Sequence, residues 1–270
     1  MITYPFAKIN LGLKVTAKRD DGFHDIETVF YPVEKLSDIL EVVESKEMDF
    51  KVTGIPIGDA KENIVLKAYK LLKDKYFLPP VKILLEKNIP TGAGLGGGSS
   101  DGTHMLMLLN DLFNLCLSDE QLAGYALQLG SDCPFFIHGK PAFALGRGEI
   151  LNDINVSLSG FQLIIVKPPV HISTAEAYKG ITPKGSRLSL KRVIVFPVAR
   201  WNVSIQNQFE SHIFESHPEI KVIKDSLYRQ GATFALMSGS GSAVYGLFRQ
   251  GKRNIKQLFP ADYQIFEATL

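Results

Sequence analysis

The sequence predicts a protein of mixed α and β structure, either α+β or α/β, built in two parts. Strand-like and helix-like segments alternate in both halves of the chain, which is the pattern of mixed folds. The stretch 151–160 is polar and typical of a loop, so we expect a first domain over 1–155 and a second over 156–270. A chain of 270 residues is long enough to bury a sizeable core without disulfides or metals.

Composition narrows the class of protein further. The chain is 45% hydrophobic and 21% charged, as in ordinary soluble globular proteins, and its net charge of +2 argues against a dedicated nucleic-acid binder. Its two cysteines imply no disulfide framework and fit a reducing compartment. The first residues have no signal-peptide core, and the longest apolar runs are too short to span a bilayer. We therefore expect a cytoplasmic protein with no membrane or nucleic-acid partner and no structural metal.

The first elements are strands with a turn between them. "KINLGLKV" (8–15) alternates, so it predicts a strand with Lys8 and Asn10 on the face opposite the apolar one. A turn at Asp21-Gly22 precedes a second strand, and short strands are expected within 37–45 and 49–54. The apolar spacing in 62–76 predicts a helix, and "VKILLEKNI" (81–89) predicts a further strand.

Helices follow in the middle of the chain, and mixed elements in its second half. One amphipathic helix begins near Ser99, and the next opens on a capping box of Ser118 and Gln121. A strand is expected over 161–169 and a helix over 217–230, closed by Gly231. The final pattern, "TFALMSGSGSAVYGLF" (233–248), predicts a strand, a second glycine–serine loop and another strand.

The run "NIPTGAGLGGGSSDG" (88–102) joins the predicted strand to the first of these helices. A helix N-terminus preceded by glycines binds anions, because its free N–H groups and its dipole favour negative charge. The predicted strand before the run and the predicted helix after it argue against a flexible linker, which needs no ordered element on either side. A Walker A loop needs a lysine after its last glycine, which is absent here, and a Rossmann loop needs a strand after its helix. The predicted phosphate-binding residues are Pro90, Thr91, Gly92, Ala93, Gly94, Leu95, Gly96, Gly97, Gly98, Ser99 and Ser100.

The glycine run resembles the phosphate loop of the GHMP small-molecule kinases. "AKINLGLKV", "DDGFHDIETVF", "LGSDCPFFIHG" and "MSGSGSAVYGLF" are similar to that family in the same order along the chain. The resemblance implies an α+β, two-domain GHMP kinase fold with a ribosomal-S5-like N-terminal and a ferredoxin-like C-terminal domain. It also implies ATP and Mg²⁺, with ATP and substrate meeting in the cleft between the domains. These motifs favour members whose alcohol substrate carries a cytidine diphosphate group.

The resemblance assigns catalytic roles to two residues. Asp132 is the predicted base that accepts the proton of the attacking hydroxyl, although its position also suits a helix N-cap. Lys8 is its predicted partner, which stabilises the charge of the transferred group and keeps the carboxylate ionised.

Five further residues are predicted to bind ligands. The resemblance assigns Phe23 and Tyr178 to stacking on the cytosine, His24 to a hydrogen bond with it, and Asn10 to the substrate. Phe23 stands where relatives often carry tyrosine, so a hydrogen bond from that hydroxyl is absent here. Asn63 is proposed for the adenine pocket of ATP, with a helix N-cap as the alternative.

Two other functions remain open from the sequence. One is a GHMP kinase acting on an alcohol without a nucleotide group, which would need no aromatic pair for a pyrimidine. The other is a non-catalytic nucleotide-binding protein of the same fold, which would need neither Lys8 nor Asp132. The motif "NQFE", with Asn207 and Glu210, also resembles a family motif, but its chemistry is unassigned.

Overall fold

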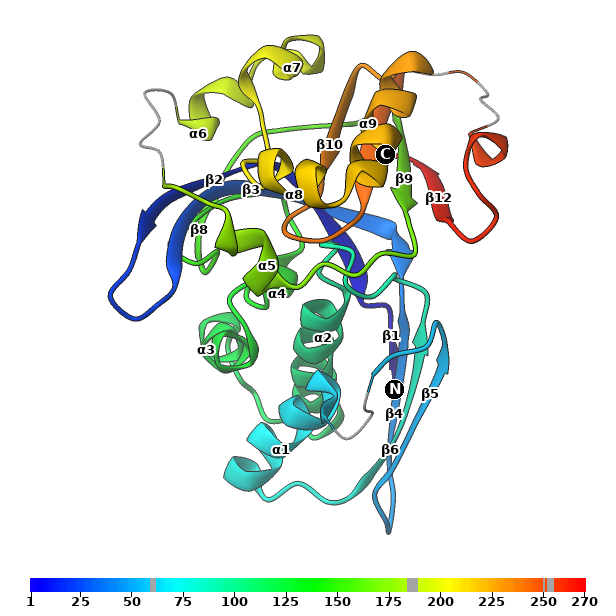
Figure 1. The fold of residues 1–270 in the computed structure, drawn as a ribbon. Helices are drawn as coiled ribbons and strands as arrows, with labels where there is room; N and C mark the ends of the chain where they lie inside the picture. Colours follow the sequence, from blue (N-terminus) through cyan, green and yellow to red (C-terminus); the bar gives the residue numbers. More distant parts are fainter. Residues whose placement is uncertain (59–61, 184–188, 250, 252–254) are drawn as a thin grey trace. The chain divides into compact units, whose positions relative to one another are not determined.

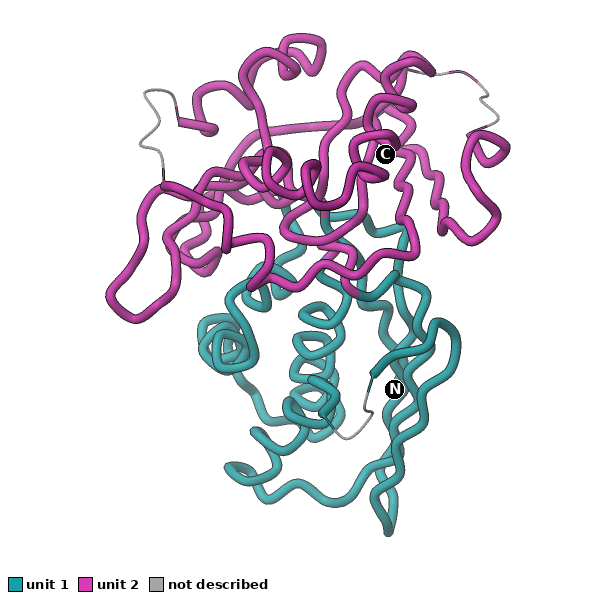
Figure 2. Tube along the Cα trace, in the orientation of Figure 1, with its two compact units in different colours: residues 1–8, 32–91, 96–140 teal, residues 9–31, 92–95, 141–270 magenta. Residues whose placement is uncertain are grey.

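The computed structural model describes residues 1–58, 62–183, 189–249, 251 and 255–270 (Figure 1). They form two compact units, and neither is continuous in sequence (Figure 2). Unit 1 comprises Met1–Lys8, Pro32–Thr91 and Gly96–Lys140; unit 2 comprises Ile9–Tyr31, Gly92–Leu95 and Pro141–Leu270. The expected domain boundary between 155 and 156 stays a prediction. Within the described ranges, no helix is both long and apolar enough to cross a membrane.

Unit 1 contains a four-stranded sheet in the order β1-β4-β6-β5. Strands β1 (Ile2–Thr3) and β4 (Ile39–Glu44) are antiparallel to their neighbours, whereas β5 (Asp49–Gly54) runs parallel to β6 (Val81–Lys87). Buried and exposed residues alternate strictly along β6, so one face of the sheet is in the core. The α-helices among the described residues of the unit are α1 (Ile64–Tyr76), α2 (Gly97–Leu112), α3 (Asp119–Leu129) and α4 (Phe135–His138).

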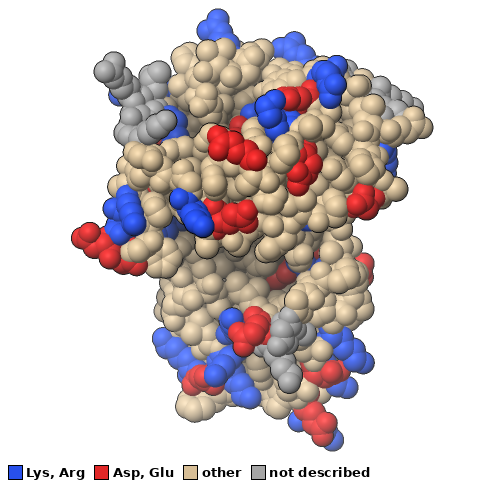
Figure 3. Space-filling model, in the orientation of Figure 1, with Lys and Arg blue, Asp and Glu red and all other residues tan. Residues whose placement is uncertain are grey.

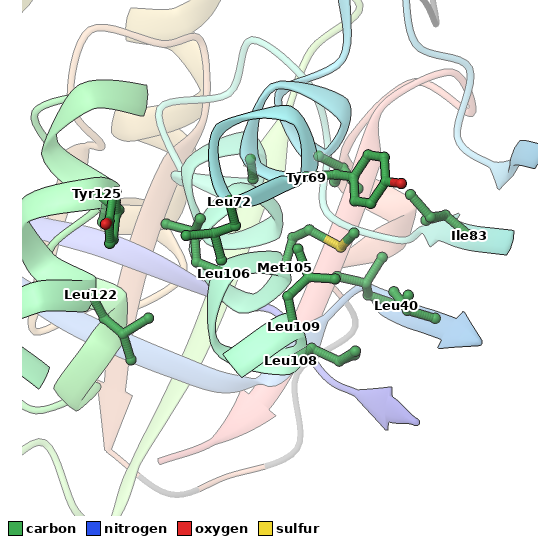
Figure 4. Packing of buried hydrophobic residues seen from close by; sticks show 14 of the residues in the cluster. Leu40, Tyr69, Leu72, Ile83, Met105, Leu106, Leu108, Leu109, Leu122 and Tyr125 are labelled. Atoms are coloured by element: carbon green, nitrogen blue, oxygen red, sulfur yellow. The ribbon is translucent and has the colours of Figure 1, made fainter. Parts of the chain in front are cut away.

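The core of unit 1 lies between this sheet and its helices. Figure 4 shows Leu40 and Ile83 of the sheet beside Tyr69 of α1 and Met105 and Leu109 of α2. Helix α2 is buried on most of its surface, so it is the central helix of the unit. Because α2 is packed tightly in the core, its first turn is held in a fixed place. The end of the glycine run, which forms that turn, is therefore fixed as well.

A second sheet has the order β2-β3-β7-β8. Its strands are β2 (Phe6–Lys18), β3 (His24–Ser37), β7 (Ala142–Leu145) and β8 (Ile150–Asp153). The predicted turn between the first two strands is confirmed, with Gly22 at a φ of 85°. Both long strands pass from one unit into the other, since the unit boundaries fall after Lys8 and after Tyr31.

The third sheet belongs to unit 2 and has the order β10-β11-β9-β12. All its pairs are antiparallel: β9 (Phe161–Lys167) is flanked by β11 (Val244–Arg249) and β12 (Gln264–Thr269), and β10 (Phe234–Met237) pairs with β11. The helical segments of unit 2 are α5 (Thr174–Lys179), α6 (Leu190–Val193), η2 (Val198–Arg200), α7 (Trp201–Ser204), α8 (Glu210–Ser216), α9 (Pro218–Arg229) and η3 (Lys256–Leu258).

The α+β class is confirmed, as are most of the expected elements. The capping box of Ser118 and Gln121 is present at the start of α3. Helix α2 begins at Gly97, slightly before the expected start near Ser99. The short helices α6, α7 and α8 were not expected individually. On the face drawn in Figure 3, acidic and basic side chains are interspersed, in keeping with the small net charge.

Candidate active site

The glycine run forms a loop whose backbone conformation alternates. Gly92, Gly94 and Gly96 have φ values of 64°, 76° and 72°, while Ala93 and Leu95 between them keep ordinary negative φ and bury their side chains. Where such positive-φ residues alternate with residues in the right-handed helical region, successive N–H groups turn toward one side and form a concavity that binds anions. We therefore take residues 92–96 as the candidate anion cradle.

The start of α2, in unit 1, has free N–H groups of its own. Gly96 is the N-cap, and the first intrahelical bond runs from Ser100 N to Gly96 O at 2.8 Å. The N–H groups of the residues between them have no intrahelical acceptor, as at every helix start. Gly98 is exposed and Ser99 is half-buried, whereas Ser100 is buried with its hydroxyl 3.3 Å from His104 Nδ1. Of the two serines, Ser99 is thus the one with a side chain open to solvent.

Lys8 and Asp132 form an ion pair in unit 1. Lys8 Nζ lies 3.4 Å from Asp132 Oδ2; the lysine side chain is 3% exposed and the carboxylate 33%. Asp132 sits in the turn between α3 and α4, and the N-cap of α4 is Pro134 without a side-chain cap bond. The cap alternative for Asp132 is therefore wrong. Burial lowers the pKa of Lys8, and the attraction of Asp132 opposes that shift in part.

The ion pair is packed directly against the glycine loop. A Cβ placed on Gly96 would lie 3.0 Å from Lys8 Cγ and 2.8 Å from Phe136 Cζ. The lysine stem therefore passes beneath the residue that opens α2, and only glycine leaves room for it. The contact joins the residue that carries a buried cation to the residue that opens the helix, and cations and free N–H groups are both used to bind phosphates.

A second buried charge cluster, which the sequence did not reveal, lies at the other end of the loop. Lys87, the last residue of β6, donates to Asp38 and, at 2.6 Å, to Asp101 Oδ2 of α2. Asp38 Oδ1 also accepts the backbone N–H of Asn88 and of Ile89, at 2.5 and 2.8 Å. Burial raises the pKa of Asp101 well above its usual range. The cluster ties the first residues of the loop to the helix that follows it.

The two asparagines of the predicted set are held by hydrogen bonds of the fold. Asn10 is buried in unit 2; its Nδ2 donates to Thr28 Oγ1 at 2.9 Å, and Thr28 in turn donates to Gly12 O. Asn63 Oδ1 accepts from Val65 N at 2.9 Å, so Asn63 is the N-cap of α1. The structure thus shows the capping role for Asn63, and its contact with adenine stays a prediction.

The aromatic residues predicted for the substrate form two contacts in unit 2. The rings of His24 and Tyr178 stack on one another, with centroids 4.7 Å apart and planes 23° apart. Rings this close leave no room for a base between them. A base can stack on Tyr178 only if His24 moves, or if it binds to an outer face of the pair. Phe23 is 52% exposed and has the guanidinium of Arg147 over its ring, 4.8 Å from the centroid. The predicted pyrimidine clamp stays a prediction.

Arg147 is a candidate binding residue that sequence reasoning missed. Its Nε is buried without a hydrogen bond among the described atoms but forms an ion pair with Glu149 Oε1 at 3.7 Å, and Gly146 and Gly148 on either side have positive φ. The only signal in the sequence was this pair of glycines around one cation in "LGRGE", which is too short to separate a turn from a site.

Comparison with known proteins places both halves of the chain among the GHMP kinases. The model of the GHMP kinases N terminal domain matches residues 63–140, and that of the GHMP kinases C terminal matches 199–261. The 4-diphosphocytidyl-2-C-methyl-D-erythritol kinase of Azobacteroides pseudotrichonymphae is 54% identical over 94% of this chain and 96% of its own. That of Bacteroides thetaiotaomicron is 53% identical over 92% of each chain.

A solved structure agrees with these relatives. The crystal structure of a 4-(cytidine 5'-diphospho)-2C-methyl-D-erythritol kinase has a TM-score of 0.77 and 32% identity, and the match covers 92% of this chain and 90% of that one. The chain therefore belongs to the 4-diphosphocytidyl-2-C-methyl-D-erythritol kinase family within the GHMP kinases. As a GHMP kinase it is an ATP-dependent phosphotransferase.

Proposed function

We propose that this protein transfers the γ-phosphoryl group of ATP to the 2-hydroxyl of 4-diphosphocytidyl-2-C-methyl-D-erythritol, releasing the 2-phosphate and ADP. This is a step of the non-mevalonate isoprenoid pathway, and we place it in the cytoplasm, in line with the low cysteine count. The observation that carries the reaction type is the Lys8–Asp132 pair packed against Gly96 of the phosphate loop. The choice of substrate is supported by the near full-length similarity to relatives of that name.

In this proposal the loop 90–100 holds the phosphates of ATP through its backbone N–H groups. Its alternating conformation and the helix start at Gly97 support that role, because both direct N–H groups toward an anion. Ser99 adds a hydroxyl, since its side chain is open to solvent. Asn63 would reach adenine through its Nδ2 amino group, the part of the side chain that the helix cap leaves available.

Asp132 and Lys8 have different roles in the proposed reaction. The 2-hydroxyl oxygen forms a bond to the γ-phosphorus as the bond to the bridging oxygen of ADP breaks, and the hydroxyl proton passes to Asp132. Asp132 suits this role because a third of its side chain is exposed, whereas Lys8 is almost wholly buried. Lys8 keeps the carboxylate ionised and stabilises the negative charge on the group in transfer.

Mg²⁺ fits this site as an ion that arrives with the nucleotide. Among the described residues, no group of three or more histidine, cysteine or acidic side chains is arranged to hold a metal. Mg²⁺ commonly takes most of its ligands from phosphates and water, with one or two from protein carboxylates. Bound in that way it would neutralise phosphate charge.

The cytidine part of the substrate is assigned to unit 2. Phe23 is half exposed and offers a ring for stacking, and the next residue in sequence, His24, forms an aromatic pair with Tyr178. Asn10 is assigned to the substrate by the family resemblance alone; in the structure it is buried and its Nδ2 donates to Thr28. A pyrimidine handle explains why a small-molecule kinase carries this concentration of aromatic groups.

The test is ADP release with 4-diphosphocytidyl-2-C-methyl-D-erythritol, run beside homoserine, mevalonate and galactose. We expect turnover with the cytidylated alcohol alone. Turnover with one of the other alcohols would refute the substrate assignment while keeping the kinase. ATP binding without ADP release from any of the four would favour a non-catalytic nucleotide-binding protein.

A further inference from the structure

The motif "NQFE" of unit 2, whose chemistry is unassigned, is hydrogen-bonded to the end of β10 and to the second glycine–serine loop, 238–242, which follows that strand (Figure 1). We infer that Asn207 and Glu210 are positioning residues that fix this loop and, through it, residues 92–94 of the phosphate loop. The inference rests on the proposed function, in which residues 92–94 help to bind ATP.

The motif holds the backbone at the beginning of the loop 238–242. Asn207 Nδ2 donates to both Met237 O and Gly239 O at 2.8 Å, which uses both of its protons, while its Oδ1 accepts from Phe209 N at 3.0 Å. Glu210 Oε1 accepts from Met237 N at 2.9 Å. The end of β10 and the start of the loop are therefore bonded through carbonyl and N–H groups alike.

The motif is itself held in place on its other sides. Asn207 is 2% exposed and Glu210 8%, and Glu210 Oε2 accepts from Lys224 Nζ of α9 at 2.6 Å. The backbone beside Asn207 is joined to β2, where Leu13 N donates to Gln206 O at 2.9 Å. A buried carboxylate and carboxamide with these hydrogen bonds have little freedom to move. They therefore restrain the position of the loop to which they are hydrogen-bonded.

The loop 238–242 and the residue after it in turn fix the carbonyl groups of the phosphate loop. Each of three consecutive carbonyl oxygens in the phosphate loop accepts a hydrogen bond from this segment. The pairs are Ser242 N to Gly92 O at 3.3 Å, Ala243 N to Ala93 O at 3.2 Å and Ser238 Oγ to Gly94 O at 2.9 Å. The contact is also close, because a Cβ on Gly94 would lie 2.9 Å from Gly241 N.

Fixing these carbonyls also fixes the N–H groups that follow them. A trans peptide is planar, with its N–H pointing opposite to its C=O. Carbonyls 92–94 turned toward the loop 238–242 therefore turn the N–H groups of Ala93, Gly94 and Leu95 away from it. Those N–H groups belong to the alternating segment proposed as the anion cradle. The motif thus determines, through two layers of hydrogen bonds, which way the cradle faces.

Two conservative variants with matched controls test this role. Asn207→Asp preserves size and the acceptor for Phe209 N but removes both donors to the loop, and Glu210→Gln removes the charge that pairs with Lys224. Asn202→Asp and Glu215→Gln make the same changes at exposed positions of unit 2. The dissociation constant of ATP, the KM for ATP and for the cytidylated alcohol, and the melting temperature are measured for all four and for the unaltered protein.

We expect Asn207→Asp to weaken ATP binding about tenfold, as loss of buried hydrogen bonds does, with less than about a twofold change in KM for the alcohol. Glu210→Gln should weaken it by about threefold, because glutamine still accepts from Met237 N. The controls should match the unaltered protein.

Unchanged ATP binding in a folded Asn207→Asp variant would overturn the inference, as would equal weakening of ATP and alcohol alongside a lower melting temperature. If Asn207→Asp fails to fold, Glu210→Gln decides by the same criteria. An unaltered protein that binds no ATP would instead refute the proposed function, so the two failures are distinct.

Discussion

Replacing Lys8 with methionine should remove most of the activity and yet leave the protein as stable as before or more stable. Methionine has similar length and no charge, so it fills the same buried space beneath Gly96 without the ammonium group. Loss of the cation next to the transferred phosphoryl group should lower kcat by about 10²–10³, the cost of one well-placed electrostatic contact.

The gain in stability follows from the balance of two terms at this site. Two unit charges 3.4 Å apart attract by about 5 kcal/mol at an effective dielectric of 20 and by about 1 kcal/mol in water. Asp132 is one-third exposed, so the attraction falls toward the lower figure, whereas desolvating a fully buried ammonium costs several kcal/mol. The lowered pKa of Lys8 shows that burial outweighs the attraction. Because Asp132 keeps part of its solvation when the lysine is removed, we expect Lys8→Met to leave the free energy of unfolding unchanged or to raise it by up to about 2 kcal/mol.

The stability difference between Lys8→Met and the wild type should also depend on pH. The pKa of Lys8 is lower in the folded protein than the ordinary 10.5 that it regains on unfolding. Between the two values the unfolded chain binds the proton and the native protein does not, so the wild type gains stability as pH rises. The advantage of Lys8→Met should therefore be full below the folded pKa and shrink as pH approaches 10.5.

The assay is urea unfolding of both proteins at about pH 7 and about pH 10, with Lys35→Met as control. Lys35 is an exposed lysine of β3 in unit 1, and its replacement should change the free energy of unfolding by less than about 0.5 kcal/mol at either pH. A Lys8→Met protein less stable than the wild type at neutral pH would refute the reasoning. An advantage that persists unchanged at high pH would do so as well.

Three further outcomes are expected. Asp132→Asn should lower kcat by about 10²–10⁴ with folding retained, and a near wild-type rate in steady-state assays would remove Asp132 from the chemistry. Phe23→Ala and Tyr178→Ala should raise the KM for the cytidylated alcohol by about tenfold and leave ATP binding unaltered; weaker ATP binding in calorimetry would show that the cytidine site is misplaced. Gly96→Ala should lower the free energy of unfolding by about 1–2 kcal/mol, because the φ of Gly96 is left-handed. Gly98→Ala should raise the free energy of unfolding by about 0.4–1 kcal/mol and also raise the KM for ATP. Equal effects of the two substitutions on unfolding would contradict this expectation.

Local signals in the sequence were sufficient where neighbouring residues determine the structure. The alternation of Val81–Lys87 gave β6, and the reciprocal bonds of Ser118 and Gln121 gave the start of α3. The glycine run was placed correctly between a strand and a helix because both flanking periodicities were strong. Such features depend on residues a few positions apart, which pattern analysis compares directly.

Contacts between distant residues were beyond that analysis. Lys8 and Asp132 were paired only through a family resemblance, since a single lysine on a strand normally indicates solvated surface. No pattern suggested that Lys87, Asp38 and Asp101 would share one buried cluster. The exchange of segments between the units also has no compositional signal, because β2 and β3 each read as one continuous strand.

The glycines of the phosphate loop show why composition alone gives an incomplete account of a binding site. At most of them the space for a side chain is already taken by the protein. A Cβ would meet His171 at Gly92, the backbone of the loop 238–242 at Gly94, Lys8 at Gly96, Ile89 at Gly97 and Ile64 at Gly102. These glycines are explained by packing, whether or not a phosphate binds.

Gly98 differs from the other glycines of the run in that a Cβ there would meet nothing within 4 Å. It lies exposed at the start of α2, where alanine would be the better helix residue by about 1 kcal/mol. Neither backbone conformation nor packing accounts for glycine at this position. We infer that a ligand approaches the N–H groups of the helix closely at this position, and ATP binding by Gly98→Ala tests that contact without a structural loss.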